Sequence, residues 1–284
     1  MECAERVDCE KFATQIRIAT IKSIQKRGFG HIGGCMSMAD LVSVLYQCIL
    51  NVDPNDPRNP NRDWLICSKG HAGPILYSAL ALKGFFPMNW LDTLNQSGTS
   101  LPSHCDRKKT PGIDMTTGSL GQGISMAAGV ALGNRLDGKN NYTYCILGDG
   151  ETQEGQVWEA ASFAAHFKLD HLIVFVDNNH EQLDGAIAQV NNIEPIDTKF
   201  ESFGWRTFNC NGHDCSSIKT AIKCSKSSTG KPCIIILDTI KGKGCSFALG
   251  KTNHHMTVSK EDANEAIFNL EKHLASLERG RYEH

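Results

Sequence analysis

The chain has 284 residues, of which 40% are hydrophobic, so it is long enough to bury a substantial core. Its 29 basic and 31 acidic side chains give a formal net charge of -2, which offers no support for nucleic-acid binding. The sequence contains no run of 18 apolar residues, so it predicts no transmembrane helix. The charged N-terminus, MECAERVDCEK, lacks the apolar stretch of a signal peptide.

The chain contains twelve cysteines but no Cys-x-x-Cys pair, so we do not expect a zinc site. Several cysteines, such as Cys48, Cys145 and Cys233, fall within apolar runs, where a free thiol behaves as a small hydrophobic side chain. We therefore expect reduced thiols in a cytoplasmic protein.

Apolar strand-like segments alternate with helix-like segments along the chain. The first helix is expected over 9–27, because Phe12, Ile16 and Ile24 share a face and Gly28 follows the basic last turn. Such alternation predicts an α/β fold, with a mostly parallel sheet covered by helices on both faces and a single domain over 1–284. Further helices are expected over 36–50, 72–83, 124–136, 153–168 and 261–280, and strands over 64–67, 142–147, 171–177 and 233–238.

Polar side chains follow two of the predicted strands. Asp149 lies between two glycines directly after the strand at 142–147, and Asn179 ends the next strand, thirty residues later. That spacing is typical of a strand–helix–strand unit, so both residues should lie at the carboxyl ends of parallel strands, where open α/β sheets bind ligands. A carboxylate, an amide oxygen and a nearby backbone carbonyl would suit Mg²⁺ with a bound phosphate.

A series of motifs resembles the N-terminal, thiamine diphosphate-binding segment of the transketolase family, in the same order and over nearly the whole chain. The motifs are GFGHIGG (28–34), SKGHAGPILYSAL (68–80), TPGIDMTTGSLGQG (110–123), GDGETQEG (148–155), DNNHEQLDG (177–185), FGW (203–205) and TIKGKG (239–244).

The resemblance implies how thiamine diphosphate and Mg²⁺ would be held. Asp149, Asn179 and the main-chain carbonyl of Glu181 would bind the metal, although the family usually has Gly-Ile at positions 180–181. Glu154 matches a buried carboxylate that communicates between paired active sites, and Lys241 matches a lysine on the cofactor side. Gly118, Ser119 and Leu120 match the loop beside the aminopyrimidine, and Gly150 matches a diphosphate contact.

Four histidines match family residues that line the cofactor channel, contact substrate hydroxyls and move protons. They are His31, His71, His104 and His254, of which His71 and His254 are also expected to contact the cofactor. The family usually shows Trp-His-Gly where this chain has Asn253-His254-His255, so the alignment leaves a choice between His254 and His255. His104 is followed by Cys105, where proline is usual.

The resemblance further implies transfer of a two-carbon ketol unit from a ketose to an aldose, with the cofactor supplying the carbanion chemistry. Transketolases continue with a pyrimidine-binding domain and a C-terminal domain, and the former supplies the glutamate that activates the cofactor. We find no segment here for either domain. We therefore expect the N-terminal subunit of a split transketolase, inactive until a complementary subunit completes it, in an α2β2 assembly. The substrate could be a pentose phosphate, a branched sugar phosphate or a sulfonated sugar.

Other interpretations are weaker. GFGHIG (28–33) has the glycine spacing of a dinucleotide site, but a helix precedes it where that motif requires a strand. GSLGQG (118–123) before a helix could be a generic phosphate-binding turn. The α subunit of a 2-oxo-acid dehydrogenase would share the GDG and NN motifs, and a non-catalytic regulatory module could retain the fold; neither would be expected to carry the whole set.

Overall fold

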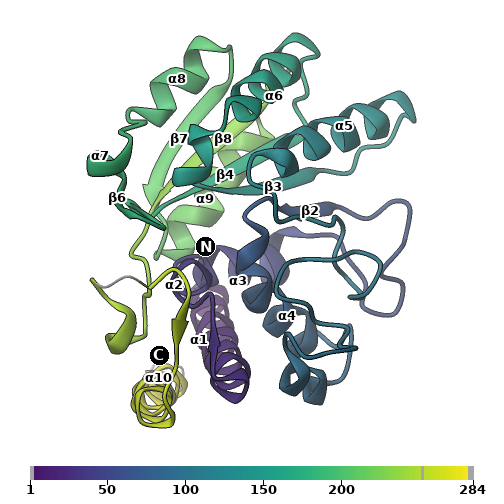
Figure 1. Cartoon of the computed structure of the whole chain (residues 1–284). Helices are drawn as coiled ribbons and strands as arrows, with labels where there is room; N and C mark the ends of the chain where they lie inside the picture. The colour runs from purple at the N-terminus through teal and green to yellow at the C-terminus, as the bar shows by residue number, and fades with distance from the viewer. Residues whose placement is uncertain (1–2, 251–252, 281–284) are drawn as a thin grey trace.

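The computed structural model describes residues 3–250 and 253–280, and its centre is a five-stranded sheet (Figure 1). All neighbouring strands in this sheet are parallel, in the order β2-β3-β4-β8-β7. The expected parallel α/β fold is therefore confirmed. The strands are β2 (Trp64–Cys67), β3 (Thr143–Gly148), β4 (Leu172–Asn178), β8 (Cys233–Asp238) and β7 (Arg206–Asn211).

Helices cover both faces of the sheet (Figure 1). Alternate side chains of each strand enter two separate hydrophobic cores: Tyr144 and Ile146 of β3 face one, and Cys145 and Leu147 face the other. One face is covered by α1 (Cys3–Arg27), α3 (Ala39–Val44), α4 (Gly73–Leu82) and α9 (Cys215–Lys226), with α10 (Lys260–Gly280) packed on α1. The other carries α5 (Gln122–Leu136), α6 (Gly155–His166) and α8 (Ile196–Ser202).

The remaining elements are short, and several of them follow the carboxyl ends of β2, β3 and β4. No helix among the described residues is both long and apolar enough to cross a membrane. The short strands are β1 (Phe29–Gly30), paired with β9 (Met256–Thr257), and β5 (Glu181–Gln182), paired with β6 (Gly185–Ala186). The short helices are α2 (Gly33–Met36), η1 (Leu45–Ile49), η2 (Gly70–Ala72), η3 (Met88–Thr93), η4 (Gly150–Gln153), α7 (Ile187–Val190) and η5 (Ser246–Ala248).

The helix expected over 36–50 is interrupted. Residues 33–36 form α2, and α3 starts only at Ala39 because Met38 has non-helical backbone angles. The hydroxyl of Ser37 donates to Asp177 at the end of β4, 2.6 Å away, so the break attaches this segment to the sheet. A π-helical turn, η1, then replaces the final α-helical turn.

Candidate active site

A cavity of about 240 Å³ lies at the carboxyl ends of β3 and β4. Asp149 follows β3 directly and Asn179 follows β4, so the sheet brings the two predicted metal ligands to one edge, as the spacing of the motifs indicated. The lining includes these two residues with Gly34, Lys69, His71, Leu120, Gly150, Glu151, Gln153, Glu154, Glu181, Gln182, Leu183, Lys241 and His254.

Asp149 is a buried carboxylate that no cationic side chain contacts within residues 3–250 and 253–280. Its two oxygens accept hydrogen bonds from the backbone amides of Gly150, at 2.7 Å, and His180, at 2.6 Å. Burial and the charge of Asp177 together raise the pKa of Asp149 to about 7, which the two amides and Lys69 only partly oppose. A cation beside Asp149 would supply the missing positive charge.

Its neighbour Asp177 is fully buried too, but it is well compensated. The ammonium group of Lys69 lies 2.5 Å from Asp177 Oδ2 and also donates to the carbonyl of Gly34. Ser37 and Thr239 donate their hydroxyls to the same carboxylate, each at 2.6 Å. Burial acts to raise the pKa of Asp177, but Lys69 and the hydroxyl donors outweigh it and hold this pKa below its ordinary value. This ion pair is therefore part of the framework beneath the cavity.

Lys241 is the cationic counterpart of Asp149 in the same cavity. Its ammonium group is buried and contacts only the carbonyl oxygens of Glu181, at 3.4 Å, and Gln182, at 3.3 Å, among the groups the structure describes. Burial lowers the pKa of Lys241, although the carboxylates of Glu181 and Asp149 act in the opposite direction. A buried cation and a buried anion, neither neutralised by a partner in contact, suit a ligand that carries both signs, such as a metal-bound diphosphate.

The predicted metal-ligand set would consist of oxygen atoms of different kinds. Within residues 3–250 and 253–280, no cluster of three His, Cys, Asp or Glu side chains is arranged to hold a metal. Asn179 donates its amide nitrogen to Asp177, at 2.9 Å, and its oxygen accepts the backbone amide of Glu181, at 3.2 Å. His180 between them has a φ of +63°, a left-handed conformation that turns the chain at this point. One carboxylate, one amide oxygen and one carbonyl form a donor set of the type that Mg²⁺ accepts.

The predicted histidines come from four distant segments and form one cluster. The ring of His31 lies 5.4 Å from those of His71 and His104 and 5.3 Å from that of His254, between centroids. His71 and His254 are 4.6 Å apart and line the cavity. His255 also contacts His31, at 4.7 Å, so both candidates from the ambiguous motif belong to the cluster. Among the described residues, none of these five rings has a hydrogen-bond partner for its nitrogens.

Two close backbone contacts bring these histidine segments together. A side chain on Gly70 would collide with the backbone of Thr117 and Gly118 at 2.6–2.8 Å, so glycine allows His71 to lie beside the loop that carries Gly118. Gly33 similarly leaves no room for a Cβ against Asn253, whose carbonyl accepts the Gly33 amide at 3.0 Å. Glycine at both positions is therefore a steric requirement of the site.

Four histidines of the cluster, His31, His71, His104 and His254, favour the neutral form. Burial is the main reason that the pKa of His31 falls to about 3 and that of His254 to about 4, with the neighbouring histidines and, for His254, Lys241 adding to the effect. Burial also lowers the pKa values of His71 and His104. Near pH 7 these rings can therefore each donate one hydrogen bond and accept another, which suits them to hydroxyl groups.

The remaining predicted residues are divided between the cavity and its border. Leu120, Gly150 and Glu154 line the cavity, whereas Gly118 packs against His104 and Ser119 lies next to it in the chain. Glu154 is exposed in the single chain, so burial of this carboxylate would require a second chain. The buried carboxylate here is Glu151, which accepts from Ser68, from the amide of Gly121 at 2.8 Å and from the amide of Gly148 at 3.1 Å.

Sequence reasoning passed over Lys69, Asp177 and Glu151 as site residues. All three stand inside quoted motifs, SKGHAG, DNNHEQ and GDGETQ, and that position was the only signal available. Glu151 pairs with Ser68, 83 positions away, and Lys69 pairs with Asp177, 108 positions away. Motif spacing along the chain does not reveal contacts over such separations.

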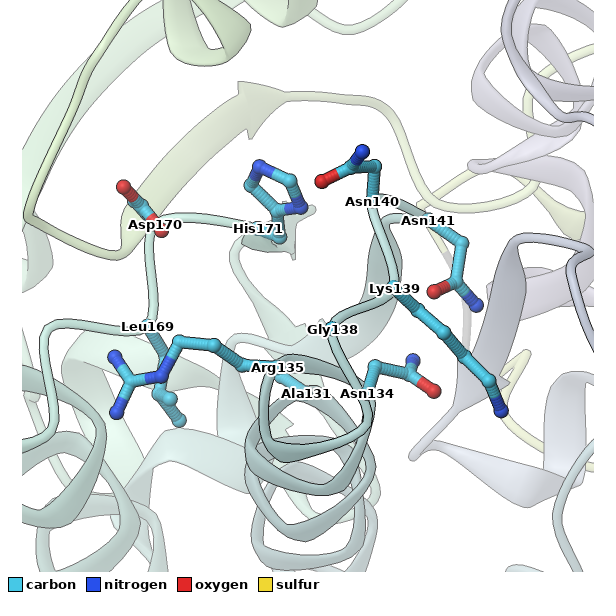
Figure 2. Close-up of a pocket in the computed structure, with 10 residues that line it drawn as sticks. All are labelled: Ala131, Asn134, Arg135, Gly138, Lys139, Asn140, Asn141, Leu169, Asp170 and His171. Carbon is cyan, nitrogen blue, oxygen red and sulfur yellow. The ribbon is translucent and has the colours of Figure 1, made fainter.

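A second cavity, of about 230 Å³, lies at the opposite edge of the sheet (Figure 2). Figure 2 shows Asn134, Arg135 and Lys139 beside it, and His171 across from them. It lies before the first residues of β3 and β4, and none of the predicted site residues reaches it. The predicted residues therefore gather at the carboxyl edge alone.

An open parallel α/β sheet with this charge arrangement is typical of proteins that bind a cofactor diphosphate at the carboxyl ends of the strands. Residues 9–271 match the family model described as the thiamine diphosphate-binding domain of transketolase. The chain belongs to the transketolase family, as the motifs indicated, and is a transketolase subunit of the N-terminal, thiamine diphosphate-binding type. The match favours this family over the 2-oxo-acid dehydrogenase α subunits.

Two relatives are subunits of similar length. The chain is 49% identical over 269 residues to the 6-deoxy-6-sulfo-D-fructose transketolase subunit SqwG of Clostridium sp. (strain MSTE9), covering 94% of this chain and 98% of that subunit. It is 39% identical over 260 residues to one subunit of the apulose-4-phosphate transketolase of Actinobacillus succinogenes, covering 91% of this chain and 94% of the relative.

Solved transketolases share the fold but are longer. The Pichia stipitis transketolase in complex with sedoheptulose 7-phosphate superposes with a TM-score of 0.86 and 29% identity, over 98% of this chain and 45% of that one. The Campylobacter jejuni enzyme gives a TM-score of 0.85 and 30% identity, over 100% of this chain and 48% of its own. The chain therefore spans just under half the length of these transketolases.

Proposed function

We propose that this chain is the cofactor-binding half of a split transketolase that moves a two-carbon ketol unit from an anionic ketose to an aldose. The observation that carries the proposal is the pair of uncompensated buried charges, Asp149 and Lys241, in one cavity beside a cluster of neutral histidines. Mg²⁺ would be held by Asp149, Asn179 and the carbonyl of Glu181. The diphosphate would lie against Lys241 and Gly150, and bound thiamine diphosphate would supply the carbanion chemistry.

The protein's own contribution is to position the sugar and to manage protons. His31, His71, His104 and His254 are proposed to hydrogen-bond the hydroxyls of the donor and acceptor and to accept or return their protons. The low pKa values of His31 and His254 support the hydrogen-bonding part of this role, because a neutral ring has one free acceptor nitrogen near pH 7. The loop at Gly118, Ser119 and Leu120 would support the aminopyrimidine side of the cofactor.

A complementary subunit is proposed to supply the pyrimidine-binding and C-terminal domains. The two relatives described above, of which this chain covers 98% and 94%, are both named as subunits, and the solved transketolases are about twice as long. Glu154, exposed here at the border of the cavity, is suited to contact a second copy of the site in an α2β2 assembly. Eleven cysteines whose side chains the structure describes are free thiols, which supports a cytoplasmic location.

The relatives' names guide the choice of donor. One is named for a sulfonated fructose and another for a sugar phosphate, so we propose a ketose with an anionic terminal group. Sulfofructose is the first donor to test, because the relative named for it shares 49% of aligned residues.

The deciding experiment measures ketol transfer by this chain in isolation and then with its complementary subunit. Thiamine diphosphate, Mg²⁺ and an aldose acceptor are present in both assays, with sulfofructose, fructose 6-phosphate and xylulose 5-phosphate as donors. We expect transfer only in the mixture. Transfer by the single chain would refute the split-site proposal, and inactivity of a mixture that binds cofactor would refute the assigned reaction.

A further inference from the structure

His255 is the outermost ring of the histidine cluster. His71 and His254 line the cavity, and His31 contacts both of them. His255 contacts His31, at 4.7 Å with an interplanar angle of 75°, and on its far side it contacts Phe29, at 5.4 Å. His71 and His254 therefore lie at the cavity, His31 connects them to His255, and His255 is the exposed member of this group.

The ring of His255 is held in place while its polar atoms remain available. Its neighbours Met256 and Thr257 form β9, which pairs with Phe29 and Gly30 of β1, so the ribbon fixes the backbone that carries the ring. The residue is exposed, and its ring nitrogens have no hydrogen-bond partner among the described residues. A fixed, solvent-facing imidazole with unused nitrogens is suited to bind a ligand group.

The same border of the cluster carries a permanent positive charge. The guanidinium of Arg27 lies over the ring of Phe29, 4.3 Å from its centroid, and Phe29 in turn contacts His255. Arg27 donates from Nε to the carbonyl of Asn95, at 3.1 Å, which holds the guanidinium in this position. An anionic group next to His255 would therefore meet favourable electrostatics.

We propose that His255 is a specificity residue that donates a hydrogen bond to the anionic end of the donor ketose. This inference rests on the proposed function. A ketose whose carbonyl lies at the cofactor end and whose chain extends past His31 brings its most distant atoms to His255. A bond from an imidazole N–H to a sulfonate or phosphate oxygen is charge-assisted and so contributes more than a bond to a hydroxyl. On this arrangement, a short, uncharged ketose is expected not to reach this ring.

The test compares His255→Ala and His255→Asn with the wild-type chain, each assembled with the complementary subunit, thiamine diphosphate and Mg²⁺. The donors are sulfofructose and fructose 6-phosphate, which carry an anion on carbon 6, and L-erythrulose, which is short and uncharged. For the better anionic donor we expect His255→Ala to raise KM about tenfold with kcat within about twofold, while erythrulose kinetics stay unchanged. Asparagine retains an N–H donor and should restore most of the loss.

His171→Ala provides a matched control. This variant removes another imidazole in contact with an aromatic ring, that of Tyr142 at 4.5 Å between centroids, but at the opposite edge of the sheet, where Figure 2 shows His171. It should leave the kinetics with all three donors as in the wild type.

Equal losses of kcat with the long and the short donor would overturn the proposal, because they would show that His255 only orients His31. Unchanged kinetics in His255→Ala would overturn it too. Calorimetric binding of the unreactive alditols, made by reducing the two anionic donors, separates this inference from the proposed function. If the assembly shows no ketol transfer but the wild type binds the alditols more tightly than His255→Ala does, the proposed reaction is refuted and the role of His255 is supported. Equal alditol binding by the two proteins would refute the role of His255.

Discussion

Asp149 is the carboxylate of the site whose ionised form burial disfavours, because no cationic side chain contacts it among the described residues. Asp149→Asn keeps the shape of the side chain but removes the charge that a divalent cation would balance. We expect Mg²⁺-dependent binding of thiamine diphosphate to weaken at least about 100-fold, or roughly 3 kcal/mol. Tryptophan fluorescence titration of the assembled protein would measure it.

The matched control for this change is Asp137→Asn. Asp137 is an exposed carboxylate that pairs with Lys139 at 3.2 Å, near the opposite edge of the sheet. Its replacement should leave cofactor affinity within about twofold of the wild type, since exposed pairs contribute little. Equal affinity in the Asp149 and Asp137 variants would show that Asp149 does not hold the metal.

Single-residue predictions from sequence were strongest where a residue ends a strand. Asp149 and Asn179 meet at one edge because strand order and spacing require it, and the structure places both in the cavity. The Lys69–Asp177 pair was not predictable in this way, because its two residues are 108 positions apart. They meet only when α2, whose Gly34 carbonyl accepts from Lys69, packs beside the end of β4. The choice between His254 and His255 also required coordinates, which place both rings against His31.

At the level of elements, Asp40 joins three parts of the fold. Its carboxylate on α3 pairs with Arg17 of α1, at 2.5 Å, and with His213 before α9, at 2.8 Å. Asp40→Asn would leave the buried guanidinium without a counter-charge. We expect the free energy of unfolding to fall by about 3–5 kcal/mol in urea denaturation. Glu10→Gln, which breaks the exposed pair with Arg6, should cost less than about 0.5 kcal/mol.

The same contacts predict a pH dependence of stability. Burial acts to raise the pKa of Asp40, but Arg17 and His213 outweigh it and lower this pKa from 3.8 to about 2. The folded state therefore binds this proton less readily than the unfolded state, and the stabilisation is complete above about pH 4. It should be lost between about pH 4 and 2, to the extent of about 2 kcal/mol in the wild type, and this acid-dependent loss should be absent in Asp40→Asn.

Gly70 links η2 to the loop at Thr117 and Gly118, and Gly70→Ala tests that contact. The added Cβ would force the two backbones apart, so we expect cofactor affinity to fall about tenfold or more in the same titration. Gly133→Ala serves as the control, because a Cβ there meets nothing within 4 Å in the interior of α5. That change should instead stabilise the chain by about 0.5–1 kcal/mol. Unchanged affinity in Gly70→Ala would contradict a positioning role for this contact.

Sequence patterns predicted the buried elements better than the part-exposed elements. Strands β2, β3, β4 and β8 are short apolar runs, and each was predicted to within a residue or two. Edge strand β7 was not predicted, because its side chains are mostly part-exposed and its sequence, RTFNCN, has no apolar run. Helix α9 was also overlooked, since its buried face consists partly of Cys215, Lys219 and Ser225 rather than large apolar residues.

On the scale of the whole molecule, two exposed leucines border the cofactor cavity. Leu183 is 57% exposed and Leu120 is 38% exposed, and both line that cavity. If the complementary subunit closes the site, it covers these side chains. Leu183→Asp should therefore weaken association about tenfold or more in analytical ultracentrifugation. Leu136→Asp is the control, because Leu136 is 77% exposed but lies near the opposite cavity, and it should leave association unchanged. Equal weakening of association by Leu183→Asp and Leu136→Asp would refute this interface.

The sheet order described above also constrains how the chain folds. Strand β7 has a single neighbour in the sheet, β8, which is synthesised more than twenty residues later and lies between β7 and β4. Within the five-stranded sheet, a nascent chain that ends before Cys233 can therefore pair only β2, β3 and β4, and it leaves the apolar strand β4 with one edge open to other chains. Insertion of β8 covers that edge, so we expect the growing polypeptide to be most prone to aggregation before β8 has been synthesised.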